Sequence, residues 1–206
     1  MTRRNIRNVG ILIFDGVDLL DFAGPFEVFH QTRLSPGVQP RRSRETAPVE
    51  GVTVAPTSAP VRANGGVLIT PHHSFADTPR IDLLVVPGGL GTRRLIHDRE
   101  LIDWLRDRAA TAERVASVCT GALLLAQAGL LQDRRATTHW AAADLLESLG
   151  SGAIVVRDQR VVEDGIVTSA GVSSGIDMAF HVVEALFGRG VAEDTARYIE
   201  YQLQKS

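Results

Sequence analysis

The chain has 206 residues, of which 44% are hydrophobic, and this is enough apolar sequence to bury one substantial core. A formal net charge of −2 gives no electrostatic basis for binding nucleic acid or an anionic membrane surface. The single cysteine excludes an internal disulfide, no Cys/His group has zinc-ligand spacing, and no stretch reaches the ~20 apolar residues of a membrane span. We therefore expect a soluble, cytoplasmic protein that holds no metal.

Strand-like apolar segments alternate with helical patterns along the whole chain. Strands are predicted at residues 8–14, 52–54, 81–86, around Val115, and at 136–138, 154–156, 160–162 and 166–168. Helices are predicted at 19–31, 98–110, 122–128, 175–187 and 192–204, with another beginning at His139. Residues 32–50 are expected to form an exposed loop or a weak strand, residues 64–66 a tight turn, and residues 164–165 a hairpin. This alternation predicts an α/β fold with a mostly parallel sheet covered on both faces.

Cys119 lies where a predicted strand passes sharply into a helix, between the small residues Ser117 and Gly121. A side chain at such an elbow is held out at the carboxyl edge of the sheet. The unpaired N–H groups at a helix start favour thiolate over thiol, and thiolate is the reactive form. A buried structural cysteine is the alternative interpretation. The elbow favours a reactive thiol, which we expect to be largely ionised at neutral pH.

Four segments are expected to reach the same edge of the sheet: residues 15–21, 87–91, 117–121 and 168–173. Within the first, Asp21 follows two leucines and precedes Phe22, and such apolar surroundings raise the pKa of a carboxyl. A carboxyl of this kind beside a thiol is a general acid/base. Helix N-capping explains Asp21 equally well from local sequence. Asp15 and Asp18 are interpreted as turn and cap residues.

Other polar groups are expected beside Cys119. Gly88 and Gly89 form a turn whose N–H groups could serve as an oxyanion hole, although glycine turns after strands are common. Thr120 offers a hydroxyl and an N–H next to the thiol, or is simply a residue of the first helical turn. His139 is a candidate imidazole partner of Cys119, with a hydrogen-bonded structural histidine as the alternative. The sequence has neither a GxGxxG motif nor a P-loop, so no nucleotide is implied.

Five segments in this order resemble the ThiJ/PfpI superfamily: VGILIF at 9–14, LDFAGP at 20–25, LVVPGG at 84–89, VCTG at 118–121 and RATTHW at 135–140. The resemblance covers roughly residues 7–187. It implies a flavodoxin-like three-layer sandwich, usually dimeric, with a nucleophile-elbow cysteine approached by a carboxylate from the first helix. Cys119 and Asp21 occupy those positions. We therefore expect residues 1–206 to form a single ThiJ/PfpI (class I glutamine amidotransferase-like) domain that assembles as a homodimer.

Within the superfamily, the LDxxGP and CTG segments are most similar to enzymes that hydrate isonitriles to N-substituted formamides. This resemblance implies that Cys119 attacks the isonitrile carbon of a small-molecule substrate, that Asp21 supplies the proton, and that Thr120 orients the carboxylate or water. The loop with Gly171 and Val172 would flank the pocket, and no cofactor is needed. Peptidases of the superfamily typically have histidine in place of Thr120, and its glyoxalases and deglycases generally have glutamate in place of Asp21. Both differences argue against those activities, whereas a hydratase would be expected to have a more glycine-rich loop at 169–170.

Two other functions remain open. The same motifs, ATTHW included, recur in the amino-terminal sensor domain of AraC-type transcription regulators, so a ligand-sensing domain is the main alternative. The sequence shows no basic recognition helix, and DNA binding by that route is not expected. The third interpretation is a redox- or stress-responsive Cys119, because an exposed cysteine of low pKa oxidises readily.

Overall fold

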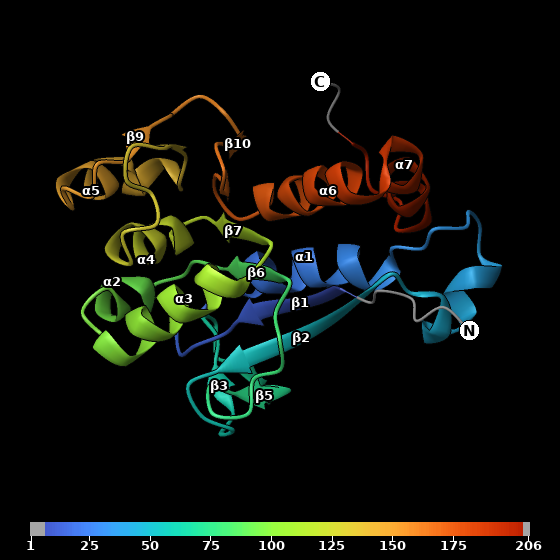
Figure 1. The fold of residues 1–206 in the computed structure, drawn as a ribbon, viewed down its shortest axis with the longest axis horizontal. Helices are drawn as coiled ribbons and strands as arrows, with labels where there is room; N and C mark the ends of the chain where they lie inside the picture. Colours follow the sequence, from blue (N-terminus) through green and yellow to red (C-terminus); the bar gives the residue numbers. More distant parts are fainter. Residues whose placement is uncertain (1–6, 204–206) are drawn as a thin grey trace.

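The computed structural model describes residues 7–203, which are arranged around a seven-stranded sheet (Figure 1). In spatial order its strands are β10 (Val161–Glu163), β11 (Val167–Ser169), β7 (Arg114–Val118), β6 (Leu83–Val86), β1 (Arg7–Leu12), β2 (Val49–Ala55) and β5 (His73–Ser74). Neighbouring strands are parallel except β10, which pairs antiparallel with β11. The predicted parallel sheet and its final hairpin are therefore confirmed.

Helices cover both faces of this sheet (Figure 1). One layer contains α1 (Leu19–Gln31), α6 (Ser174–Phe187) and α7 (Arg189–Tyr198), which contact one another. The other contains α2 (Thr92–Leu95), α3 (Arg99–Thr111), α4 (Gly121–Gln127) and α5 (Ala143–Ser148), of which α4 contacts the other three. Both α4 and α6 contact β7. The chain thus folds as the three-layer, flavodoxin-like sandwich that the family resemblance implied.

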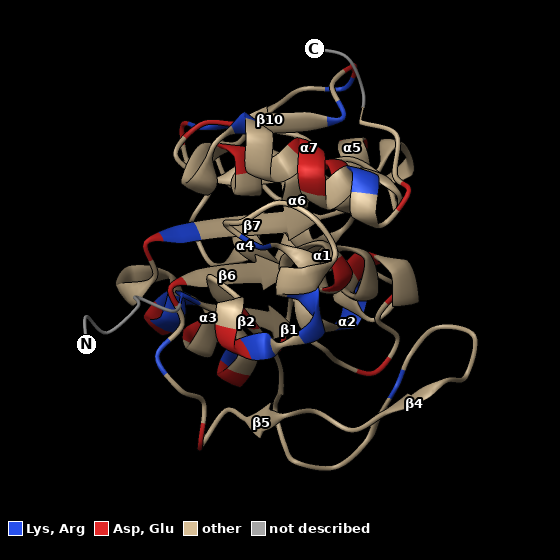
Figure 2. Cartoon of the chain, turned by 90° about the vertical axis from the view of Figure 1, so that its right-hand side faces the viewer, with Lys and Arg blue, Asp and Glu red and all other residues tan. Residues whose placement is uncertain are grey.

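Two small sheets lie outside the central one. Strands β3 (Val61–Arg62) and β4 (Leu68–Ile69) form a hairpin that extends away from the body of the molecule (Figure 2). The sequence predicted only its turn, where Gly65 and Gly66 have φ values of 88° and 90°. Strand β8 (Arg135–Ala136) pairs in parallel with β9 (Ile154–Val155). Strands were predicted near these positions, but nothing in the sequence indicated that they form a sheet of their own.

Several element ends differ from the predictions for local reasons. Strand β2 begins at Val49, earlier than expected, because residues 49–54 are paired with β1. The segment before β2 contains two short 3-10 helices, η1 (Gln39–Arg42) and η2 (Arg44–Thr46), rather than a strand. The last helix was expected to reach residue 204 but ends at Tyr198, and Glu200 then adopts a φ of 55°. Residues 1–6 and 204–206 of the expected domain, which include the expected end of the last helix, lie outside the described residues.

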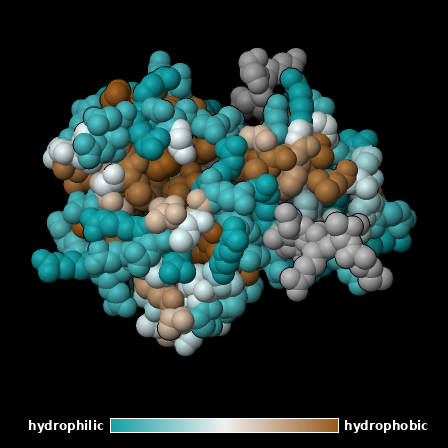
Figure 3. Space-filling model, in the orientation of Figure 1, coloured by the Kyte–Doolittle hydropathy of each residue, from teal (hydrophilic) through white to brown (hydrophobic). Residues whose placement is uncertain are grey.

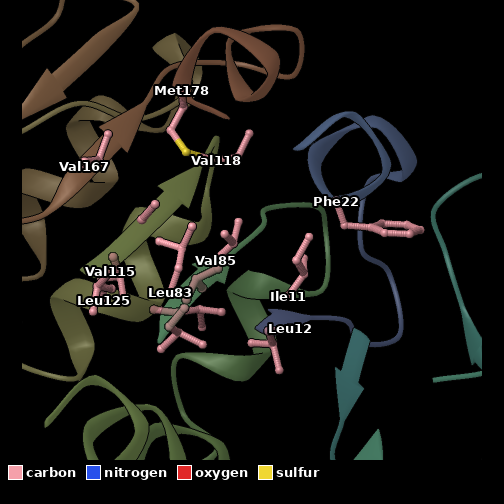
Figure 4. Close-up of a cluster of buried hydrophobic side chains, with 14 of the residues drawn as sticks. Ile11, Leu12, Phe22, Leu83, Val85, Val115, Val118, Leu125, Val167 and Met178 are labelled. Carbon is pink, nitrogen blue, oxygen red and sulfur yellow. The ribbon is translucent and has the colours of Figure 1, made fainter. Parts of the chain in front are cut away.

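The core lies between the sheet and the two helical layers. Figure 4 shows Ile11, Leu83 and Val118 from the strands together with Met178 from α6, all of them buried. On the outside, acidic and basic residues are interspersed (Figure 2), and hydrophilic residues alternate with strips of apolar surface (Figure 3). No helix among residues 7–203 is long and apolar enough to cross a membrane.

Candidate functional site

Cys119 lies at a tight elbow between β7 and α4. Its φ is 55°, a left-handed conformation that is uncommon for a residue with a side chain. The turn needs Gly121, because a Cβ there would lie 2.0 Å from a carbonyl oxygen of β6. The Cys119 N–H donates to the carbonyls of Ser169 (3.1 Å) and Ala170 (3.0 Å), and the Thr138 hydroxyl donates to its carbonyl (2.8 Å). These bonds from the neighbouring loops hold the strained residue in place.

Asp21 lies in the first turn of α1 and is fully buried. Its Oδ2 accepts a hydrogen bond from the Gly88 N–H at 3.0 Å, whereas its Oδ1 has no hydrogen-bond partner among residues 7–203. The N-cap of α1 is Asp18. N-capping is therefore the wrong interpretation of Asp21, whose carboxyl is directed into the site.

The side chains of Asp18, Asp21 and Cys119 converge: one carboxylate oxygen of each aspartate and the Cys119 Sγ all lie within 4.8 Å of one another. Asp18 is half-buried, and its Oδ1 accepts from Asn64 Nδ2 of the β3–β4 hairpin at 2.8 Å. Asp18 thus has the N-cap position that the sequence predicted, but its side chain makes no capping hydrogen bond. Two carboxylates and a thiol could also ligate a cation, and the expectation that the protein holds no metal stays a prediction.

Burial changes the acidity of both central groups. It raises the pKa of Asp21 to about 7, with a further increase from the charge of Asp18, while the Gly88 N–H and Cys119 oppose the rise. Burial also raises the pKa of Cys119 to about 12, and the charge of Asp21 makes a smaller contribution in the same direction. The N–H groups of Val172 and Thr120 oppose this rise. The expectation of a thiolate at neutral pH is therefore wrong, because desolvation outweighs the backbone N–H groups. Asp21 is the member of the pair that titrates near neutral pH.

The Gly88–Gly89 turn supports the acidic group and the elbow through its two N–H groups. That of Gly88 donates to Asp21, and that of Gly89 donates to Thr120 Oγ1 at 2.9 Å. A Cβ on Gly88 would lie 2.6 Å from Thr120 Oγ1 and 2.9 Å from Asp21 Oδ2, so only glycine fits between them. The Thr92 hydroxyl lies 3.0 Å from Thr120 Oγ1. An oxyanion role for these glycines stays a prediction, since both N–H groups have partners here.

His139, Gly171 and Val172 were also predicted to belong to the site, and all three lie beside the elbow at Cys119. The Nδ1 of His139 accepts the Ala141 N–H at 3.2 Å, which caps the 3-10 helix η3 (Trp140–Ala142). Its ring covers Gly171, where a Cβ would lie 2.6 Å from His139 Cδ2. Val172 has a φ of 25°, and its N–H faces the Cys119 sulfur. These contacts give His139 a structural role, and pairing with Cys119 stays a prediction.

A pocket of about 420 Å³ opens beside the elbow. It is lined by Leu20, Arg157, Arg160, residues 138–140 and residues 170–174. Cys119 is only 3% exposed and does not itself line this pocket, but its N–H donates to Ala170 of the loop that forms one wall.

Three contributors to the site were not recognised from the sequence: Asp18 as a third acidic group, Asn64 as its partner and Thr92 beside Thr120. Asp18 stands three residues before Asp21 in the sequence, but its position near a predicted helix start already explained an aspartate there. No role in the site was therefore predicted for it. Nothing local distinguishes Asn64 or Thr92, because each reaches the site only through the tertiary fold.

Comparison with known proteins shows the family of the chain and its similar folds. The model of the DJ-1/PfpI family matches residues 7–185. Isonitrile hydratase of Pseudomonas putida is 41% identical over 197 residues, which cover 95% of this chain and 77% of that protein. The crystal structure of a ThiJ/PfpI family protein from Pseudomonas syringae has a TM-score of 0.84 at 32% identity, covering 97% of this chain and 77% of that one.

Regulators are also among the relatives. The HTH-type transcriptional regulator GbdR of Pseudomonas aeruginosa is 25% identical over 199 residues, which cover 97% of this chain and 52% of the regulator. The chain therefore spans about half of that protein. Since the family model covers most of the chain and the hydratase matches nearly all of it, the protein belongs to the DJ-1/PfpI family.

Proposed function

We propose that the protein is an isonitrile hydratase-like lyase that adds water to R–N≡C and releases the formamide R–NH–CHO. The observation that carries this proposal is the buried pair of Cys119 and Asp21, a nucleophile and an acid/base. The Cys119 Sγ and a carboxylate oxygen of Asp21 lie within 4.8 Å of each other. The 41% identity with a protein named isonitrile hydratase supports the same reaction.

In the first step, the Cys119 thiol adds to the terminal carbon of the isonitrile. The Asp21 carboxylate accepts the thiol proton as the sulfur–carbon bond forms, and then delivers that proton to the same carbon. The product is a thioimidate, R–N=CH–S–Cys119, and Asp21 is a carboxylate again. A pKa of about 7 suits Asp21 to both proton transfers, because the ideal catalytic pKa lies near the working pH.

In the second step, water adds to the thioimidate carbon. Asp21 accepts a proton from the water and passes it to the nitrogen, which gives R–NH–CH(OH)–S–Cys119. Asp21 then moves the hydroxyl proton to sulfur as the carbon–sulfur bond breaks, so the formamide leaves and the thiol is restored. The Oδ1 of Asp21, which lacks a hydrogen-bond partner among residues 7–203, is the atom available for these transfers.

The surrounding residues position this pair. Gly88 holds Oδ2 of Asp21, and Thr120 fixes the Gly88–Gly89 turn through its hydroxyl, so Thr120 orients the carboxylate indirectly. The N–H groups of Thr120 and Val172 face the sulfur, where they stabilise negative charge as it develops. No step in this scheme requires a metal or an organic cofactor.

Trapping the covalent intermediate tests this mechanism. Wild type is mixed with an excess of phenyl isonitrile, quenched in acid after a short time and digested, and the peptide that contains Cys119 is examined by mass spectrometry. We expect the mass of one isonitrile on Cys119 and none in Cys119→Ala. Formamide production without any such adduct, or an adduct on another residue, would remove the covalent mechanism.

A ligand-sensing domain of an AraC-like regulator is the second candidate. It is favoured by the match of 97% of this chain to about half of a transcriptional regulator. In that case the pocket would bind a small molecule without turnover, and Cys119→Ala would bind it as wild type does. A redox- or stress-responsive Cys119 is a weaker alternative, because its raised pKa and 3% exposure both slow oxidation.

We further propose a cytoplasmic homodimer built from a single domain of this kind, with a small-molecule substrate and neither nucleic acid nor membrane as a partner. Support for the dimer comes from the family resemblance. Light scattering after size-exclusion chromatography tests it, and a mass equal to one chain would contradict it.

A further inference from the structure

We propose that the pocket beside Cys119 binds the organic group of the isonitrile and selects substrates whose group is neutral and aromatic or bulky and apolar, with Trp140 as its main contact. This inference rests on the proposed function, which supplies an isonitrile as the substrate.

Several residues that line the pocket also contact Cys119 or adjoin Asp21. The loop at residues 170–172 lines the pocket and also contacts Cys119, since the Ala170 carbonyl accepts the Cys119 N–H and the Val172 N–H faces the sulfur. Thr138 also lines the pocket and donates its hydroxyl to the Cys119 carbonyl. On the first helix, Leu20 lines the pocket and directly precedes Asp21. A ligand in this pocket therefore lies against the residues that hold both reactive groups.

The shape of an isonitrile suits this arrangement. Cys119 is only 3% exposed and does not line the pocket, so a substrate that reacts there needs a narrow reactive end. The R–N≡C unit is linear and slim, which would let its terminal carbon pass toward the thiol while the organic group stays in the pocket. The outer volume of about 420 Å³ lies within the range typical of small-molecule sites, roughly 300–1,000 Å³. An aryl group fits there with room to spare.

Apolar side chains that are exposed to solvent line this pocket. Trp140 is 79% exposed, Leu20 41% and Val172 36%, which are high values for large hydrophobic residues in a folded protein. The Trp140 ring lies 5.6 Å from that of His139 at an angle of 34°, so the two rings form an aromatic wall. An apolar or aromatic group placed against this wall removes apolar surface from water and can stack on Trp140.

The charged residues of the pocket already have partners. Arg157 forms ion pairs with Asp144 (2.8 Å) and Glu147 (2.9 Å). Arg160 donates through Nε to Asp177 at 2.8 Å. A carboxylate on the substrate would be repelled by the acidic partners of these two arginines, and a cationic group would meet two guanidinium groups. The pocket therefore favours an organic group without charge.

The test compares phenyl isonitrile with methyl isonitrile in wild type, Trp140→Ala and Trp140→Phe. Loss of an aromatic stack should raise the KM for phenyl isonitrile about 3- to 10-fold in Trp140→Ala. We expect the KM for methyl isonitrile to rise less than about twofold, kcat to fall little for either substrate, and Trp140→Phe to recover most of the loss. Leu68→Ala is the control, because Leu68 is 59% exposed on the β3–β4 hairpin and does not line the pocket. Equal effects on the two substrates, or no effect on either, would overturn the proposal.

A binding titration separates this inference from the proposed function. Trp140 is the exposed tryptophan and Trp104 is 8% exposed, so an aromatic ligand in the pocket should alter the emission of Trp140. We expect saturable quenching of Cys119→Ala by N-phenylformamide, weak quenching by formamide, and loss of the response in Cys119→Ala/Trp140→Phe. If wild type hydrates neither isonitrile, the proposed function fails, and this titration alone decides whether the pocket binds aryl groups. Absence of saturable quenching would then overturn the inference as well.

Discussion

The backbone N–H of Gly88 donates to Oδ2 of Asp21 at 3.0 Å, and the other carboxyl oxygen of Asp21 has no hydrogen-bond partner among the described residues. One oxygen is therefore fixed by the turn after β6, while the second is free to exchange protons with Cys119, substrate or water. This asymmetry is the basis for the role that we give to Asp21.

Asp21→Asn tests that role, because asparagine keeps the size and the hydrogen bond to Gly88 but cannot accept a proton. Hydration of phenyl isonitrile should slow by about 10²–10⁴-fold, which is the range for loss of a general acid/base. Initial rates of formamide release measure the effect, with circular dichroism to check the fold. A loss smaller than about tenfold would leave Asp21 without a proton-transfer role.

The same substitution should change how stability depends on pH. The pKa of Asp21 is raised from 3.8 to about 7 in the folded protein, so between these values the folded state binds more protons than the unfolded state. Its contribution therefore decreases as pH rises from about 4 to 7 and is constant above. Asp21→Asn removes this decrease, so relative to wild type it should gain stability from pH 4 to 8, by at most ~4 kcal/mol.

Urea unfolding at several pH values measures that gain. The exposed Asp103→Asn is the control, because its carboxyl is 67% exposed. Parallel stability curves for wild type and Asp21→Asn would show that the carboxyl of Asp21 ionises as it does in the unfolded chain.

Asp18→Asn tests the electrostatic effect of the third acidic group. The charge of Asp18 raises the pKa of both Asp21 and Cys119, so its removal should lower both pKa values. The pH profile of Cys119 alkylation by iodoacetamide should shift to lower pH. Asp15→Asn is the matched control, because Asp15 also accepts a bond from the β3–β4 hairpin (Arg62 N–H, 2.7 Å). An equal shift in both variants would mean that loss of the hairpin anchor, rather than of charge, is responsible.

Gly88→Ala should lower both stability and activity. The new methyl group would lie 2.5 Å from the Thr120 backbone nitrogen and 2.9 Å from Asp21 Oδ2, so the turn or the carboxylate must move. Overpacking of this kind costs about 1–3 kcal/mol. Gly190→Ala is the control, because a Cβ there meets nothing within 4 Å. Thermal unfolding and turnover of the two variants measure the difference, and a Gly88→Ala enzyme as stable and active as Gly190→Ala would contradict the packing described here.

Much of the fold could be predicted because its signals are local. The apolar run at residues 81–86 and the helical spacing at residues 19–31 each depend on neighbours in sequence, and both elements formed. The β3–β4 hairpin was harder to predict, because its strands have only two residues each and are held by contacts to Asp15 and Asp18.

The candidate site also has one feature that local sequence predicts and another that only the tertiary fold determines. The elbow at Cys119 is visible in the sequence, since a strand, a cysteine and Gly121 follow one another. Its acidity is not visible, because the pKa depends on how far the fold buries the thiol and on where Asp21 and Asp18 lie. An inference from the helix start alone gave the wrong direction for this shift.

Formamide production from phenyl isonitrile, compared between wild type and Cys119→Ala, tests the central claim most directly. We predict turnover by wild type and its complete loss in a folded Cys119→Ala variant. Wild-type rates in Cys119→Ala, or no turnover by reduced and folded wild type, would contradict it.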